Sequence, residues 1–114
     1  MRYAIAVYDS EAGMAARRDP EYVAAYAAYV RALIEAGVWL GGAGLVSART
    51  ATTLRMKDGK RVVEDGPYAD TKEELGGFFL IEVADIDKAL EWAARCPSAA
   101  TGVIEVRATL PPVV

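Results

Sequence analysis

A chain of 114 residues with 54% hydrophobic and 25% charged side chains has the size and composition of one globular domain, which excludes a disordered or fibrous protein. The formal charge is −3 and the basic residues are scattered, so binding to nucleic acid or to a membrane surface has little support. No apolar run approaches the roughly 18 residues that cross a bilayer and no secretory signal is evident, so we expect a cytoplasmic protein.

The sequence contains no histidine and a single cysteine, Cys96. The usual general base and every Ser–His or Cys–His pair are therefore missing, and no internal disulfide can form. The remaining oxygen ligands bind metals weakly without a dedicated cage. We expect no cofactor and no tightly bound transition metal, and we expect Cys96 to be an inert buried thiol.

The first half of the chain predicts one strand and one long helix. Residues Arg2–Tyr8 alternate with apolar side chains on both faces, which indicates a strand covered on both sides. Asp19-Pro20-Glu21 has the pattern of a helix start, and the helix runs to Gly37. Three tyrosines at helical spacing could line a ligand cavity, but aromatics in this pattern are more often core or interface, and we interpret them so: Tyr22, Tyr26 and Tyr29. The glycine-rich stretch 38–51 has no period and is interpreted as a loop or an irregular edge.

The second half predicts a hairpin, a strand, a helix and a last strand. The hairpin turns at Asp58-Gly59, a dipeptide that suits a type I′ turn. Asp85 is the expected cap of the helix and Pro97 its stop. The predicted elements are Thr52–Lys57, Lys60–Glu64, Gly77–Val83, Ile86–Arg95 and Val103–Thr109.

This order of elements predicts an α+β fold over residues 1–114, with a five-stranded antiparallel sheet covered by two helices on one face. The strands carry apolar groups on both faces, so the apolar area on the uncovered face is larger than the apolar patch that a monomer usually exposes. We therefore expect a homodimer that pairs sheet face to sheet face.

The segment from Asp65-Gly66-Pro67-Tyr68 to Gly77 resembles the signature of the YCII-related proteins of the DGPF type. Tyr68 stands where that signature usually has Phe, and Asp70 where it more often has Glu. The resemblance extends to the 85–95 helix and to the end strand at Glu105-Val106-Arg107. It implies a ferredoxin-like fold that pairs into a dimeric α/β barrel with a cleft near the signature loop. Some relatives use a His–Asp pair, which a chain without histidine cannot supply.

Two interpretations of the signature loop stand side by side. In the functional one, the crowded carboxylates of Asp65, Asp70 and Glu73 act as acid or base, and Lys72 contacts an anion. Tyr68 and Thr71 are then expected to bind substrate. In the structural one, Gly66-Pro67 forms a turn, and Thr71 and Glu74 cap a short helical turn that ends at Gly76-Gly77.

The sequence leaves two functions open. The first is a small-molecule-binding protein or enzyme that acts on a small organic acid by carboxylate acid/base chemistry. The alternative, implied by the resemblance, is a non-catalytic regulatory partner of an extracytoplasmic-function sigma factor system. Arg17 and Arg18 are most simply interpreted as part of a solvated turn, although an arginine near a cleft can hold a substrate carboxylate.

Overall fold

Alternating side chains place the first strand at the centre of the fold. In the computed structural model, which describes residues 1–112, Tyr3, Ile5 and Val7 are buried, and the residues between them are half-buried. The helices and strands are β1 (Arg2–Ser10), α1 (Glu11–Ala15), α2 (Pro20–Glu35), β2 (Trp39–Gly44), β3 (Thr52–Lys57), β4 (Lys60–Asp65), β5 (Glu73–Glu82), α3 (Ile86–Arg95) and β6 (Val103–Ala108).

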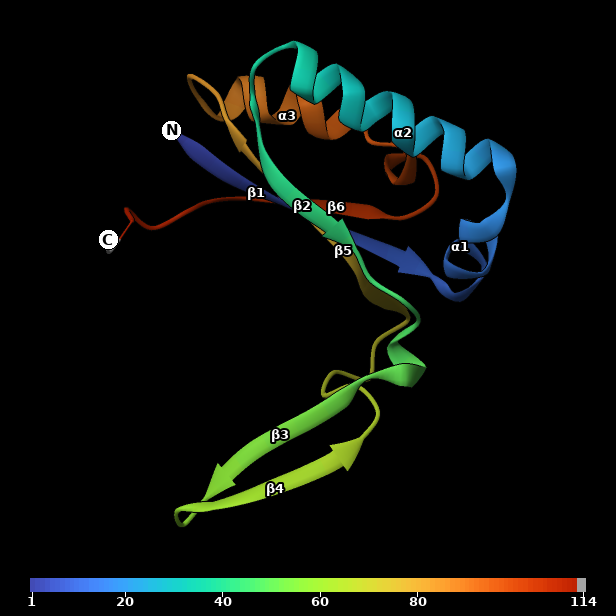
Figure 1. The fold of residues 1–114 in the computed structure, drawn as a ribbon, viewed down its shortest axis with the longest axis vertical. Coiled ribbons are helices and arrows are strands. Elements are labelled where there is room, and N and C mark those ends of the chain that lie inside the picture. Colours follow the sequence, from blue (N-terminus) through green and yellow to red (C-terminus); the bar gives the residue numbers. More distant parts are fainter. Residues whose placement is uncertain (113–114) are drawn as a thin grey trace.

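Four of the six strands form one antiparallel sheet in the order β2-β5-β1-β6. Without β3 and β4, the connectivity is β-α-β-β-α-β, that of a ferredoxin-like fold, as the sequence predicted. β3 and β4 form a separate two-stranded hairpin inserted between β2 and β5. Figure 1 shows the long helices on one side of the four-stranded sheet and the hairpin extending on the other.

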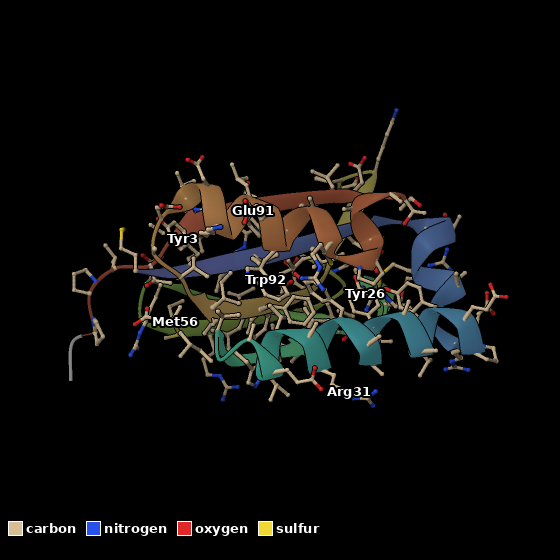
Figure 2. All side chains as sticks on the ribbon, turned by 90° about the horizontal axis from the view of Figure 1, so that it is seen from above. Tyr3, Tyr26, Arg31, Met56, Glu91 and Trp92 are labelled. Atoms are coloured by element: carbon tan, nitrogen blue, oxygen red, sulfur yellow. The ribbon has the colours of Figure 1, made fainter. Side chains whose placement is uncertain are left out.

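The core lies between the sheet and the two helices. Ile5, Leu33 and Ile81 are fully buried there, and burial of side chains of this size contributes about 1.5–3 kcal/mol each. The ring of Tyr29 meets that of Phe79 edge to face at 5.5 Å, the arrangement that aromatic pairs prefer. In Figure 2, Tyr26 and Trp92 point into the layer between α2 and α3, whereas Arg31 points away from the protein into solvent.

Of three sequence-based expectations, one becomes more definite and two need correction. The stretch interpreted as a loop or an irregular edge contains β2, an edge strand with a register shift between Trp39 and Gly41, and Gly42 fits there because the backbone of β5 passes close by. The expected five-stranded sheet has four strands, since the hairpin pairs only with itself. The expected helical turn at Thr71–Glu74 is wrong: β5 already begins at Glu73, and pairing with the end of β1 overrides the local helix signal.

A β-bulge interrupts the pairing of β1 with β5. Val7 pairs with Gly77 and Tyr8 with Leu75, so that Gly76 has no opposite residue. Such an insertion bends the strand and increases its local twist. The bulge lies close to the point where β1 leaves the sheet, and it shapes the end of the cleft described next.

Candidate functional site

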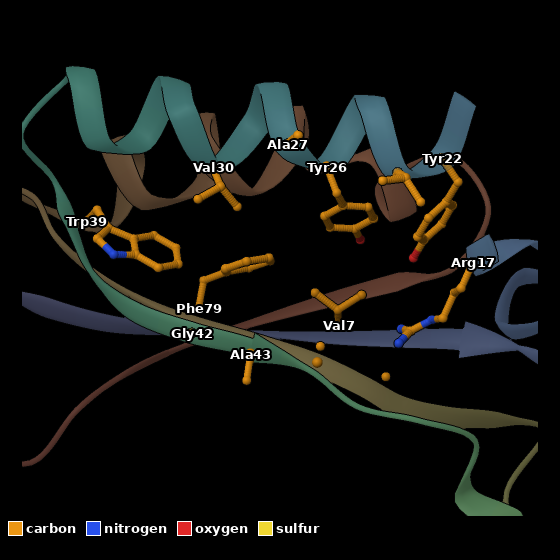
Figure 3. A pocket seen from close by; sticks show the side chains of 14 residues that line it. Val7, Arg17, Tyr22, Tyr26, Ala27, Val30, Trp39, Gly42, Ala43 and Phe79 are labelled. Atoms are coloured by element: carbon orange, nitrogen blue, oxygen red, sulfur yellow. The ribbon is translucent and has the colours of Figure 1, made fainter. Parts of the chain in front are cut away.

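A cleft of about 570 Å³ opens between α2 and the β2–β5 side of the sheet (Figure 3). Its wall is mostly aromatic or aliphatic, its floor is rich in glycine, and Arg17 is the charged side chain among the lining residues. They are Val7, Arg17, Tyr22, Val23, Tyr26, Ala27, Val30, Trp39, Gly42, Ala43, Gly44, Gly76, Gly77 and Phe79. An apolar pocket with a few convergent polar groups is the usual form of a small-molecule site.

Arg17 stands at one end of this cleft, held on two sides. Its Nη1 donates to the carbonyl oxygen of Leu45 at 2.6 Å, and its Nη2 lies 3.3 Å from Oδ2 of Asp9. The guanidinium rests against the bulge, where a Cβ on Gly76 would collide with it. Its Nε is buried and has no partner among the described residues. The head group is therefore fixed in place with donor capacity to spare.

Asp9 is fully buried at the end of β1. Its Oδ2 accepts three contacts: from Arg17, from Ser98 Oγ at 3.2 Å and from the Tyr22 hydroxyl at 3.5 Å. Its Oδ1 has no partner within residues 1–112 and lies where a Cβ on Gly13 or Gly102 would come within 3.0 or 2.9 Å. A buried carboxylate is costly unless it is paired and hydrogen-bonded. Its position at the end of the cleft, in contact with the lining residues Arg17 and Tyr22, makes Asp9 a candidate site residue.

Hydroxyl groups connect Asp9 with the cleft. Ser98 Oγ makes a very short hydrogen bond with the Tyr26 hydroxyl and lies 3.4 Å from that of Tyr22. Burial raises the pKa of Tyr26 far above its usual range, so this phenol stays protonated at neutral pH. The rings of Tyr22 and Tyr26 line the cleft, with centroids 4.8 Å apart. Together these groups can move a proton between the cleft and the buried carboxylate.

Cys96 is buried next to this network, with its Sγ 3.3 Å from the Tyr26 hydroxyl. Burial raises the pKa of the thiol, which therefore remains protonated. The burial that the sequence predicted for Cys96 is confirmed. No three histidine, cysteine, aspartate or glutamate side chains within residues 1–112 converge as a metal centre requires. No helix in the same residues is both long and apolar enough to span a membrane.

The signature loop lies apart from this cleft, and all six of the residues that the sequence proposed are exposed: Asp65, Tyr68, Asp70, Thr71, Lys72 and Glu73. Asp70, Thr71 and Lys72 border a hollow of about 470 Å³ together with residues of α1, and Tyr68 and Thr71 border an adjoining one of about 790 Å³. Asp65 ends β4, and Glu73 begins β5. The structure thus brings Asp70, Thr71 and Lys72 together, but places none of the six among the residues that line the main cleft. Their functional role stays a prediction.

Local contacts explain part of the loop. The Thr71 hydroxyl donates to the backbone oxygen of Glu73, and Oε1 of Glu74 accepts from the Ala48 amide at 2.8 Å. Arg55 lies over the ring of Tyr68, 5.3 Å from its centroid. These contacts stabilise the turn before β5 and the base of the hairpin.

Sequence reasoning missed Asp9 and Ser98, whereas a ligand cavity was its lesser alternative for the tyrosine stripe, of which Tyr22 and Tyr26 line the cleft. The signal for Asp9 was present: a carboxylate falls in phase with Tyr3, Ile5 and Val7, the buried positions of β1. Ser98 gave no such signal, because it lies in a short 3₁₀ turn after Pro97 and reaches Asp9 only in the folded chain. Arg17 lies at the cleft and not in a solvated turn.

Comparison with known proteins adds three findings. The YCII-related domain model matches residues 1–111. An uncharacterised protein of Rhizobium meliloti (strain 1021) is 39% identical over 112 residues, covering 94% of this chain and 90% of that protein. A solved structure, 5-chloro-2-hydroxyhydroquinone dehydrochlorinase from Burkholderia phenoliruptrix AC1100 in complex with 2,5-dihydroxybenzoquinone, is similar with a TM-score of 0.57. It covers 96% of this chain and 94% of its own, at 18% identity, which is a likeness of fold.

Proposed function

Because this chain belongs to the YCII-related domain family, we propose that it binds a small organic acid in the cleft between α2 and β2 and transfers a proton to or from it. The observation that carries the proposal is the buried Asp9–Arg17 pair at the end of an apolar cleft. The pair combines an anion-binding group and a proton acceptor in one place.

Arg17 is the proposed anchor for the acidic group of the ligand. Its guanidinium is always charged, and 18% of the side chain is exposed. A charge-assisted hydrogen bond in an apolar cleft is stronger than the same bond in water. The aromatic walls from Tyr26, Trp39 and Phe79 would cover the rest of the ligand.

Tyr22 and Asp9 are the proposed proton-transfer pair. The Tyr22 ring lines the cleft, and its hydroxyl points to Oδ2 of Asp9. As the phenol oxygen takes a proton from the ligand, the proton that it carried passes to Oδ2, and the reverse sequence returns it. A bridging hydroxyl of this kind lets a carboxylate act as base without direct contact with the ligand.

The similarity to the dehydrochlorinase suggests a probe. That enzyme was solved with 2,5-dihydroxybenzoquinone, a planar acidic ring compound. We expect titration calorimetry to detect binding of this compound to the chain. Arg17→Lys keeps the positive charge but loses the planar fork, so affinity should fall by about tenfold or more. Binding of equal strength in the wild type and Arg17→Lys would exclude the proposed anchor.

We also propose that the chain works as a homodimer, with the uncovered face of the sheet as the contact. That face carries Ala4, Ala6, Tyr8, Phe78 and Leu80, and Phe78 is 38% exposed. Glu105 and Arg107 lie on the same face, where they pair with Ala6 and Ala4. A two-fold axis would let Glu105 of one protomer contact Arg107 of the other, and the reverse.

The β3–β4 hairpin supports the same proposal. An isolated two-stranded hairpin is only marginally stable in water, yet this one pairs with no other strand of its own chain and exposes Leu54, Met56 and Val63. It extends on the uncovered side of the sheet (Figure 1). A second copy is the partner that this geometry favours. The sigma-factor alternative gains no support from the fold or from the comparisons.

A further inference from the structure

Four glycines line the cleft, and three of them are required by close packing. A Cβ on Gly42 would lie 2.6 Å from the backbone oxygen of Phe78, and one on Gly77 would lie 2.9 Å from that of Ala43. A Cβ on Gly76 would collide with the guanidinium of Arg17. At these positions the absence of a side chain permits the fold itself.

Gly44 is different. A Cβ there would meet no atom within 4 Å, and its φ lies outside the left-handed range that favours glycine. A strand position normally gains stability from a larger residue, since glycine packs nothing and costs backbone entropy. Packing and backbone conformation leave both Gly44, the last residue of β2, and Gly41 unexplained, and of the two only Gly44 lines the cleft.

The position of Gly44 in the cleft suggests why glycine stands there. Gly42 and Gly44 are two residues apart on β2 and pair with Phe79 and Gly77, so both face the helix side, where Phe79 contributes to the core. The next residue, Leu45, supplies the carbonyl that holds Nη1 of Arg17. Gly44 thus lies in the floor of the cleft at its charged end.

We infer that Gly44 is a specificity-determining residue, which keeps a notch open beside Arg17 so that the ligand can be broad next to its acidic group. A ring that bears the acidic oxygen directly fits such a notch, whereas a slender aliphatic acid does not need it. This inference rests on the proposed function and adds to it the shape of the ligand at its anionic end.

The test compares Gly44→Ala and Gly44→Val with the wild type for binding of 2,5-dihydroxybenzoquinone and for thermal stability. Melting should stay the same or rise in both variants, because the new side chain points into open space and suits a strand. Affinity should fall in steps, by about tenfold or more for valine, since a filled notch excludes the ring.

Gly41→Val is the matched control. Gly41 lies on the same strand, a Cβ there also meets nothing within 4 Å, and it is not among the residues that line the cleft. It pairs with Leu80 on the uncovered face of the sheet, so the control is read only where light scattering gives the same mass as for the wild type. The affinity of Gly41→Val should equal that of the wild type. Equal binding by Gly44→Val and the wild type, with binding still reduced in Arg17→Lys, would overturn this inference alone, as would equal losses in Gly41→Val and Gly44→Val. A wild type that fails to bind, or binds independently of Arg17, would overturn the proposed function and this inference with it.

Discussion

The guanidinium of Arg17 and the carboxylate of Asp9 face each other at 3.3 Å although eight residues separate them in the chain. The short helix α1 (Glu11–Ala15), capped by Ser10, reverses the chain between them. The bulge at Gly76 leaves room for the arginine head group. Helix α1, its Ser10 cap and the bulge at Gly76 thus bring the pair together. The same pair contributes to the stability of the fold and to the proposed site.

The first prediction concerns this pair. Arg17→Gln should lower the free energy of unfolding by about 3 kcal/mol, because it leaves the Asp9 carboxylate buried without its counter-ion. We place the effect at the low end for broken buried pairs, since 18% of the Arg17 side chain is exposed. Urea denaturation measures it. The double variant Asp9→Asn/Arg17→Gln should lose less than the sum of the two single variants. Additive losses would contradict direct coupling.

The second prediction is a loss of stability at alkaline pH. Burial raises the pKa of Tyr26 and Tyr29 well above the value of about 10 expected in the unfolded chain. Below pH 10 both states hold the protons. Above it only the unfolded state releases them, so stability falls as pH rises, by up to about 1.4 kcal/mol per pH unit for each tyrosine.

Tyr29→Phe provides the test of that slope. The variant loses the hydrogen bond from Tyr29 to the Trp92 carbonyl, so below pH 10 it should be less stable than the wild type by about 1 kcal/mol. The free energy of unfolding, measured in urea from pH 8 to 11, should nevertheless decline less steeply than in the wild type. Identical slopes would show that Tyr29 ionises equally in both states.

The fold was largely predictable from local patterns. Caps, proline stops and the Asp58-Gly59 turn gave the bounds of α3 and the hairpin, because those signals are short-range and strong. β2 was not predicted as a regular strand because its three glycines give no alternating pattern, and at Gly42 the glycine serves close contact with β5, which is a tertiary reason. The start of β5 was misjudged for a similar reason, because its first residues pair with β1, which lies 63 or more positions earlier in the chain.

The site was less predictable than the fold. The sequence drew attention to charged residues close together in the chain, from Asp65 to Glu73. The cleft instead joins Asp9, Arg17 and Ser98, which meet only through the sheet and the helix packing. A buried polar network spread over the chain leaves little local signal. The one available clue was a carboxylate in phase with the buried side of β1.

The third prediction tests the homodimer. Light scattering should give about twice the chain mass of 12.2 kDa. Phe78→Lys should give a monomer, because it puts a charge in the middle of the uncovered face without disturbing the core. Ile34→Lys is the control: Ile34 is an exposed apolar residue of α2, on the other side of the sheet. A wild-type monomer at micromolar concentration would rule out the proposed contact.

The last prediction separates the signature loop from the cleft. Asp70→Asn and Lys72→Met alter exposed side chains of the loop before β5, so each should change the free energy of unfolding by less than about 1 kcal/mol. Neither residue lines the main cleft, so affinity for 2,5-dihydroxybenzoquinone should equal that of the wild type, while Arg17→Lys weakens it. A loss of affinity in either loop variant, with melting unchanged, would assign ligand binding to the loop and support the functional interpretation drawn from the sequence.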